Sequence, residues 1–188
     1  KIKWKTVPYK ISAGNVAKCN DIEYALPDEE TLKEFDFSPS YNVISILDLD
    51  KTETAVKTKV IAWNNAEMYM SLDSIYLTSY MYQANRFSCP INARCIMPWF
   101  PQGQNTLVHK FDINGSDIAY SDSAIVPGTP LNQYSMDEKD GNFRIITSSS
   151  GWWRDESETG LYILDEDLEM VSSLTGLWKW ERFQSSRF

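Results

Sequence analysis

The sequence is poor in the residues on which most catalytic and metal sites depend. Its 188 residues include one histidine and three cysteines. A metal site that needs two or more histidines cannot form within one such chain. A Ser-His-Asp or Cys-His arrangement would have to use His109, the only histidine. No G-x-G-x-x-G, P-loop or G-x-S-x-G pattern is present. We therefore expect no catalytic residues, no metal ligands and no cofactor.

Positive charge and long apolar runs are also scarce. The 18 Lys and Arg residues are scattered and are outnumbered by 26 Asp and Glu, which gives a net charge of -8. Nucleic-acid binding needs clustered basic residues, so we expect no nucleic-acid partner. No window of eighteen apolar residues exists, which excludes a membrane-spanning helix of the usual length in this sequence. Residues 1–5 lack the apolar stretch of a signal peptide, and we expect the chain to be part of a longer protein.

Short strands account for most of what is present. Hydrophobic residues make up 43% of the chain and aromatic residues 13%, as in a globular protein. Apolar residues recur at period two in short runs bounded by Gly, Pro, Asn and Asp, a pattern typical of β-strands. The predicted strands are 43–49, 57–63, 67–71, 74–80, 106–113, 118–124, 131–136, 142–148, 161–165, 169–174 and 181–188.

These strands form copies of one unit. Each series opens with an apolar strand that ends in an acidic turn, at Asp48, Asp112 and Asp165, spaced 64 and 53 residues apart. In the same comparison, residues 74–79 align with 143–148 as the fourth strand. A four-stranded unit repeated at this length predicts a β-propeller, whose blades must stack to bury their faces.

The predicted fold is therefore all-β, a partial β-propeller of four-stranded antiparallel blades. Residues 1–40 lead in from a preceding blade or linker. Residues 41–188 hold two complete blades and most of a third, at about 41–80, 106–148 and 161–188. Closing the ring requires further blades from the same chain or from another subunit.

Three sequence blocks carry a family resemblance. They are YMSLDSIYL at 69–77, TLVHKFDI at 106–113 and VPGTPLNQYSMDE at 126–138. With these blocks the chain resembles a bacterial and archaeal family of secreted proteins with a C-terminal, distantly WD40-like β-propeller domain. The resemblance implies a propeller fold and an extracellular or cell-surface location. It implies no catalytic residues, because the family's functions are mostly unassigned.

The spacing of the cysteines indicates the redox state of the compartment in which the protein works. Cys89 and Cys95 enclose a five-residue loop that contains Pro90, and we expect a disulfide between them, which requires an oxidising compartment. The alternative is two reduced thiols. Cys19 is then free or pairs with sequence outside the chain.

Several polar groups have a structural and a functional interpretation. We expect His109 to be a buried hydrogen-bonding residue, because alternation places Val108 and Lys110 on the opposite face of its strand. The acidic turns, as at Asp165, either cap their own backbone or bind Ca²⁺, and we favour the turn. The pairs Asp137-Glu138 and Asp155-Glu156 are expected to be solvated turns rather than glycosidase carboxylates.

Two long segments between strands are unusual in composition. Segments 81–105 and 149–159 are expected to lie on one face of the propeller and to present aromatic and arginine side chains suited to binding. The candidate ligand-binding residues are Arg86, Arg94, Trp99, Phe100, Trp152, Trp153 and Arg154. In the alternative interpretation, the tryptophans cap blade edges as part of the core.

The sequence thus predicts a non-catalytic extracellular propeller that binds a protein or glycan ligand. Two alternatives stay open. One is part of a secreted hydrolase whose active site lies in other blades, and the other is a structural component of the cell envelope.

Overall fold

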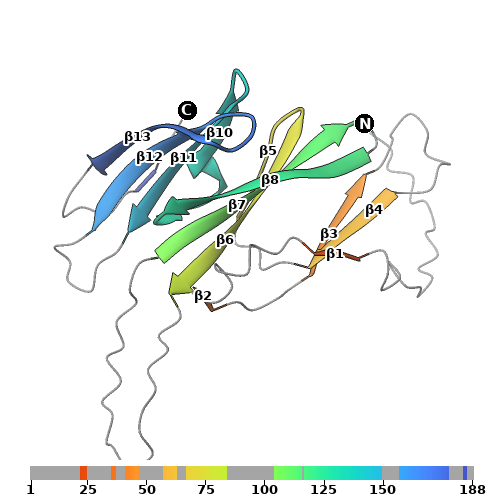
Figure 1. Cartoon of the computed structure of the whole chain (residues 1–188), viewed down its shortest axis with the longest axis horizontal. Helices are drawn as coiled ribbons and strands as arrows, with labels where there is room; N and C mark the ends of the chain where they lie inside the picture. The colour runs from red at the N-terminus through yellow and green to blue at the C-terminus, as the bar shows by residue number, and fades with distance from the viewer. Residues whose placement is uncertain are drawn as a thin grey trace, which may run out of the picture.

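The chain folds into mostly antiparallel sheets that lie side by side (Figure 1). The computed structural model describes residues 22–24, 35–36, 41–46, 57–62, 67–83, 104–115, 117–149, 157–177 and 184–185. The first sheet has the strand order β1-β4-β3 and is formed by β1 (Ile22–Tyr24), β4 (Lys57–Ala62) and β3 (Tyr41–Ile46). In it, β1 is parallel to β4, whereas β3 is antiparallel to β4.

The middle and last sheets are each built on four antiparallel strands. The middle sheet has the order β5-β6-β7-β8, with β2 also on β6, and its strands are β2 (Phe35–Asp36), β5 (Glu67–Met70), β6 (Ser74–Gln83), β7 (Gln104–Asn114) and β8 (Asp117–Pro127). The last sheet has the order β10-β11-β12-β13, with β9 also on β11. Its strands are β9 (Thr129–Pro130), β10 (Met136–Lys139), β11 (Asn142–Ser149), β12 (Glu158–Leu164) and β13 (Met170–Leu177).

Most predicted strands are confirmed within a few residues, but the strand expected at 131–136 is wrong. A 3-10 helix, η2 (Gln133–Ser135), follows Asn132 there, and the strand begins only at Met136. The Asn132 side chain accepts a hydrogen bond from the Tyr134 amide at 2.9 Å, and its carbonyl accepts one from Ser135 at 3.0 Å. Local capping by Asn therefore overrides the apolar alternation of this segment. Of the strand predicted at 181–188, the structure describes only residues 184–185, which are not part of a strand, and the rest lies outside the described residues.

The sheets group the strands differently from the units seen in the sequence. Strands β5 and β6 were expected to end the blade at 41–80, but they share one sheet with β7 and β8, which were expected to begin the blade at 106–148. In the same way β10 and β11 pair with β12 and β13. A repeat has the same spacing whichever strand is taken first, so only the hydrogen bonding decides where one blade ends.

The alignment of the fourth strands is also shifted by one residue. Ser74 pairs with Asp112, and Phe143 pairs with Leu164, the residue before Asp165. If the two aspartates are equivalent, Ser74 corresponds to Asn142 and not to Phe143. A shift of one residue exchanges the two faces of a strand, and the corrected register makes Ile75 equivalent to Phe143.

Both faces of the middle sheet are covered at its central strands β6 and β7. On one face, a cluster that includes Ile75, Leu77 and Phe111 packs against Ile44 and Ile46 of β3. The other face packs against the last sheet. This second cluster consists of Tyr76, Val108 and Val126 of the middle sheet and Met136, Phe143, Ile145, Tyr162, Leu164 and Leu168 of the last sheet. Alternation along β6 explains the arrangement, because consecutive side chains point to opposite faces.

Polar groups also join the middle and last sheets. The carboxylate of Glu138 on β10 accepts hydrogen bonds from Tyr76 at 3.0 Å and from Ser71 at 2.9 Å. The Glu138 amide donates to the Tyr69 hydroxyl at 3.1 Å. Burial and the neighbouring Glu138 carboxylate raise the pKa of Tyr76. The contact between the two sheets is therefore specified by directed hydrogen bonds as well as by apolar packing.

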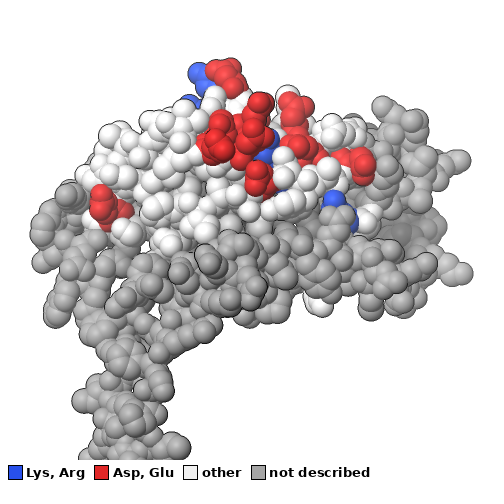
Figure 2. Space-filling view, viewed as in Figure 1, with Lys and Arg blue, Asp and Glu red and all other residues white. Residues whose placement is uncertain are grey.

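The two ends of these sheets differ. At one end, the turn end, short turns join β5 to β6, β7 to β8, β10 to β11 and β12 to β13. Asp and Glu side chains gather along one edge of the molecule, over these turns (Figure 2). At the other end, the loop end, segments 84–103 and 150–157 connect β6 to β7 and β11 to β12. The longer connections therefore leave the sheets at the end opposite the acidic turns.

Candidate binding face

The loop ends of the middle and last sheets are tied together at the link between β8 and β9. Gly128 donates its amide to the Gln104 carbonyl at 2.7 Å and accepts the Thr106 hydroxyl at 2.6 Å. Thr147 of β11 donates its hydroxyl to the Pro127 carbonyl. Gln104 directly follows segment 84–103, and Thr147 lies two residues before the end of β11. The strands that flank the two predicted binding segments are thus held at one end of the structure.

The predicted ligand-binding side chains themselves lie outside the described residues. This applies to Arg86, Arg94, Trp99, Phe100, Trp152, Trp153 and Arg154, and also to Cys89 and Cys95. The structure does correct the connectivity. Each segment joins two neighbouring strands of one sheet, whereas the sequence predicted that it joins one blade to the next.

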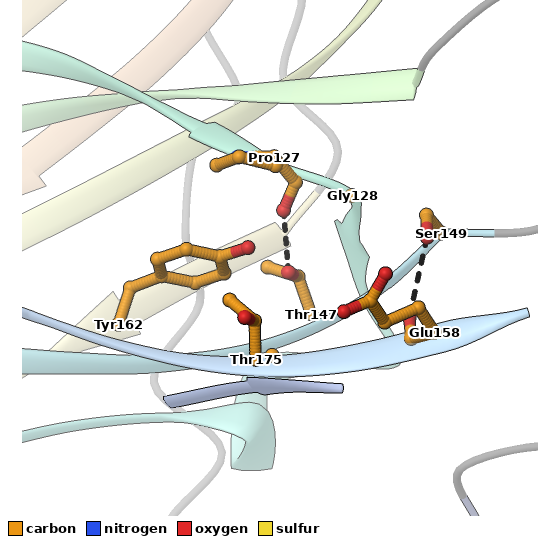
Figure 3. Close-up of a pocket in the computed structure, with 8 residues that line it drawn as sticks. Pro127, Gly128, Thr147, Ser149, Glu158, Tyr162 and Thr175 are labelled. Atoms are coloured by element: carbon orange, nitrogen blue, oxygen red, sulfur yellow. Dashed lines mark hydrogen bonds between the residues drawn. The ribbon is translucent and has the colours of Figure 1, made fainter. Parts of the chain in front are cut away.

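A cavity of about 280 Å³ lies at this end, next to segment 150–157 (Figure 3). Four strands and the link after β8 contribute to it. Its lining residues are Pro127, Gly128, Thr147, Ser149, Glu158, Gly160, Tyr162 and Thr175. This volume lies just below the range of typical small-molecule sites and suits a small group or one side chain of a larger partner.

Tyr162 forms the inner wall of the cavity. It is 7% exposed, and its ring lies over Gly160 so closely that a Cβ there would be 2.8 Å from the ring. Among the described residues the Tyr162 hydroxyl has no hydrogen-bond partner, and Figure 3 shows it directed toward the cavity. Burial and the nearby Glu158 carboxylate raise the pKa of Tyr162, so this hydroxyl is neutral at physiological pH.

Two of the small hydroxyl residues of the cavity donate hydrogen bonds to backbone carbonyls. Thr147 donates its proton to the Pro127 carbonyl, and Ser149 donates its proton to the Glu158 carbonyl at 3.3 Å (Figure 3). Each hydroxyl oxygen keeps lone pairs that can accept hydrogen bonds. Glu158 and Thr175 are exposed and lie at the rim. The cavity is therefore rich in acceptors and carries one carboxylate.

His109 has the structural role expected from the sequence. It is 1% exposed on β7, and its Nδ1 lies 3.4 Å from the Tyr120 hydroxyl. Val108 packs on the opposite face of the strand, against the last sheet. Burial lowers the pKa of His109 to about 4, so the ring is neutral at physiological pH. A neutral, buried imidazole far from the loop end is a packing residue and not part of the cavity.

The acidic turn at Asp165 caps its own backbone, as the favoured interpretation predicted. Its Oδ1 accepts the amides of Asp167 at 3.1 Å and Glu169 at 2.9 Å. The residues described by the structure contain no group of three or more His, Cys, Asp or Glu side chains placed to hold a metal ion. The same residues include no helix long and apolar enough to cross a membrane.

The sequence predicted that the pair Asp137-Glu138 is a solvated turn. This is wrong, because both residues belong to strand β10. Asp137 forms an ion pair with Arg144 on the neighbouring strand. Glu138 accepts hydrogen bonds from Tyr76 and Ser71 of the neighbouring sheet. The two carboxylates therefore join strands and sheets. Asp155 and Glu156 lie outside the described residues.

The cavity itself was missed by sequence reasoning. Glu158 and Thr175 are 17 positions apart, and Pro127 lies on a different sheet, so no local motif marks the set. One signal was available. Gly160 and Tyr162 lie on the same face of one strand, and a glycine two positions from an aromatic residue leaves room for its ring.

Stacked four-stranded antiparallel sheets define a β-propeller protein. A family model described as "Beta propeller domain" matches residues 5–188, and the chain belongs to that family. It is 45% identical over 67 residues to an uncharacterized protein of Methanocaldococcus jannaschii, a match that covers 35% of this chain and 11% of the relative. It is 41% identical over 63 residues to an uncharacterized protein of Archaeoglobus fulgidus, covering 34% of this chain and 9% of that protein. The matched segments thus span about a tenth of these relatives. No solved structure matches.

Proposed function

We propose that this chain is a non-catalytic interaction module that binds a protein or glycan ligand at its loop end. Its main support is an asymmetry between the two ends of the sheets. Within the middle and last sheets, only short turns lie at the turn end. The two long connections of these sheets leave from the loop end, where the Gly128 link ties the two sheets together. Loops on a rigid scaffold are a common place for binding residues, because the scaffold holds them in position.

The composition of the two loops supports the same proposal. Segment 84–103 contains Trp99 and Phe100 with two arginines, and segment 150–157 contains Trp152, Trp153 and Arg154. Trp and Arg are enriched among residues that dominate binding energies, and flat aromatic rings also stack on sugars. Families of propellers use the same sheets for many ligands, so the loops and not the fold determine the specificity.

We further propose that the protein works outside the cytoplasm and that Cys89 and Cys95 form a disulfide. The short spacing and the proline between them favour a closed loop in segment 84–103. Peptide mapping without reduction is expected to recover the two cysteines in one linked peptide pair. Recovery of both as free thiols from protein made in an oxidising compartment would contradict the disulfide.

The binding proposal is tested with the double variant Trp152→Ala/Trp153→Ala on a glycan array and an array of purified secreted proteins. We expect the native chain to bind a defined subset and the variant to lose this binding by about tenfold or more. The melting temperature of the variant should stay within about 2 °C of the native value, as for other surface changes.

Two outcomes would contradict the proposal. Unchanged binding by the variant would show that the loop is not the binding surface. A large fall in melting temperature would show that these tryptophans belong to the core. The matched control is the pair Met170→Ala/Val171→Ala on the exposed edge strand β13, which removes apolar surface away from the loops.

A further inference from the structure

We infer that the cavity at the loop end is a binding site for a primary ammonium group, carried either by a small amine or by a lysine side chain of a protein partner. The inference rests on the proposed function only in locating a ligand at this end of the sheets. It names a chemical class and a set of residues that the proposed function leaves open.

The hydrogen-bonding state of the lining residues determines what the cavity can recognise. Because Thr147 and Ser149 donate their protons to backbone carbonyls, their oxygens face a ligand only as acceptors. The carboxylate of Glu158 has acceptor oxygens and no donor. A ligand that satisfies these three side chains must therefore donate several hydrogen bonds. An ammonium group has three donors and no acceptor, which matches this arrangement.

Charge favours the same class of ligand. Glu158 is the only charged side chain among the described lining residues, so the part of the cavity that the structure describes has a net negative charge. A carboxylate or phosphate ligand would be repelled by it. A cation gains a charge-assisted hydrogen bond to Glu158, which is stronger than a bond between neutral groups. Exposure of Glu158 at the rim reduces this gain through solvent screening.

The shape of the cavity depends on two glycines. A Cβ on Gly160 would collide with the Tyr162 ring at 2.8 Å, and a Cβ on Gly128 would be 2.8 Å from Thr147 Oγ1. Glycine at 160 lets the Tyr162 ring lie flat against β12, which keeps its hydroxyl at the wall of the cavity and leaves the space open. Tyr162 then places at this wall a hydroxyl that can accept a hydrogen bond or donate one.

The test titrates the isotope-labelled chain with n-butylammonium while the backbone amide signals of Ser149, Glu158 and Gly160 are followed by NMR. We expect saturable shifts with n-butylammonium and with N-acetyl-lysine methylamide. The uncharged n-butanol, the anion butyrate and the neutral sugar methyl glucoside should give none. Tighter binding of the lysine derivative would identify a protein lysine as the source, and tighter binding of n-butylammonium would identify a small amine.

Glu158→Gln separates charge from shape, since it keeps the size of the side chain and removes its charge. We expect this variant to bind n-butylammonium about tenfold more weakly. The matched control is Glu169→Gln, because Glu169 is an exposed carboxylate near the turn between β12 and β13, at the turn end. Binding by this control should equal that of the native chain.

Failure of this inference is distinct from failure of the proposed function. No saturable shift with either ammonium probe, or equal binding by Glu158→Gln, would overturn the ammonium site and leave the loop residues untouched. Absence of an ammonium site would not account for a loss of arrayed-ligand binding in the Trp152→Ala/Trp153→Ala variant. The opposite result is also distinguishable. If the NMR shifts depend on Glu158 but the double variant binds the arrayed ligands as well as the native chain does, the proposed function alone is overturned.

Discussion

The ring of Tyr76 on β6 stacks on the ring of Phe143 on β11, with centroids 4.1 Å apart and planes inclined by 13°. The two residues are 1% and 0% exposed. This stack lies in the centre of the contact between the middle and last sheets, and the Tyr76 hydroxyl continues it to the Glu138 carboxylate. At this one pair of residues, apolar packing between the two sheets continues into a partly buried hydrogen bond.

Phe143→Ala should destabilise the protein by about 3–5 kcal/mol, because it removes a buried ring and leaves a cavity between the sheets. Chemical denaturation followed by tryptophan fluorescence measures the change. Leu72→Ala is the control, since Leu72 is 92% exposed in the turn between β5 and β6 and should change stability by no more than about 0.5 kcal/mol. A loss below about 1 kcal/mol for Phe143→Ala would mean that the two sheets do not unfold together.

Gly128→Ala should destabilise the protein more than Gly115→Ala. Both glycines have positive φ, +80° at Gly128 and +62° at Gly115, so each alanine carries backbone strain of about 1–2 kcal/mol. At Gly128 the new Cβ would also be 2.8 Å from Thr147 Oγ1 and 3.0 Å from the Ser148 backbone, whereas nothing lies within 4 Å at Gly115. We expect a further loss of about 1–3 kcal/mol at Gly128 from this crowding. Equal losses in thermal unfolding would contradict the close approach of the link to β11.

His109 should make the protein less stable as the pH falls. Burial lowers its pKa in the folded state from 6.5 to about 4, so the unfolded chain binds the proton more readily. The contribution of His109 to stability is therefore complete above about pH 6.5 and is lost between pH 6.5 and 4, up to about 3 kcal/mol.

The measurement compares the free energy of unfolding of the native chain and of His109→Gln across this pH range. The carboxylates titrate in both proteins, so the difference between them isolates the histidine. We expect the difference to change with pH in the stated direction. A constant difference from pH 7 to pH 4 would show that the pKa of His109 is the same in the folded and unfolded states.

Much of the fold could be predicted from local patterns, and the errors have identifiable causes. Period-two alternation located most of the described strands because each strand has one face toward a neighbouring sheet. The pattern failed at 131–136, where the Asn132 side chain and carbonyl cap a 3-10 turn. The pattern also misaligned the fourth strands by one residue. Alternation alone allows either Phe143 or Arg144 to be the counterpart of Ile75, and only the pairing of β11 with β12 identifies it as Phe143.

The candidate site was less accessible to sequence reasoning. The aromatic residues and arginines of segments 81–105 and 149–159 predicted a binding surface there. Most of the residues in these two segments lie outside the described residues. The cavity beside the second segment depends on contacts between β8, β11, β12 and β13. Two of its hydroxyl groups, those of Thr147 and Ser149, act only as acceptors because their protons are bound to carbonyls of other strands. No property of Thr or Ser in the sequence reveals where its proton goes.

The sequence by itself determined the class of fold, because repeated short amphipathic strands with acidic turns can bury their apolar faces only by stacking sheet on sheet. It also predicted that His109 is buried in its strand, because alternation places Val108 and Lys110 on the opposite face. Only the tertiary structure decided which strands share a sheet, that Glu138 joins two sheets, and that Glu158 and Tyr162 meet at one cavity. Alternation is a local property of the chain, whereas the phase of the repeat and the cavity arise from hydrogen bonds and contacts between residues far apart in sequence.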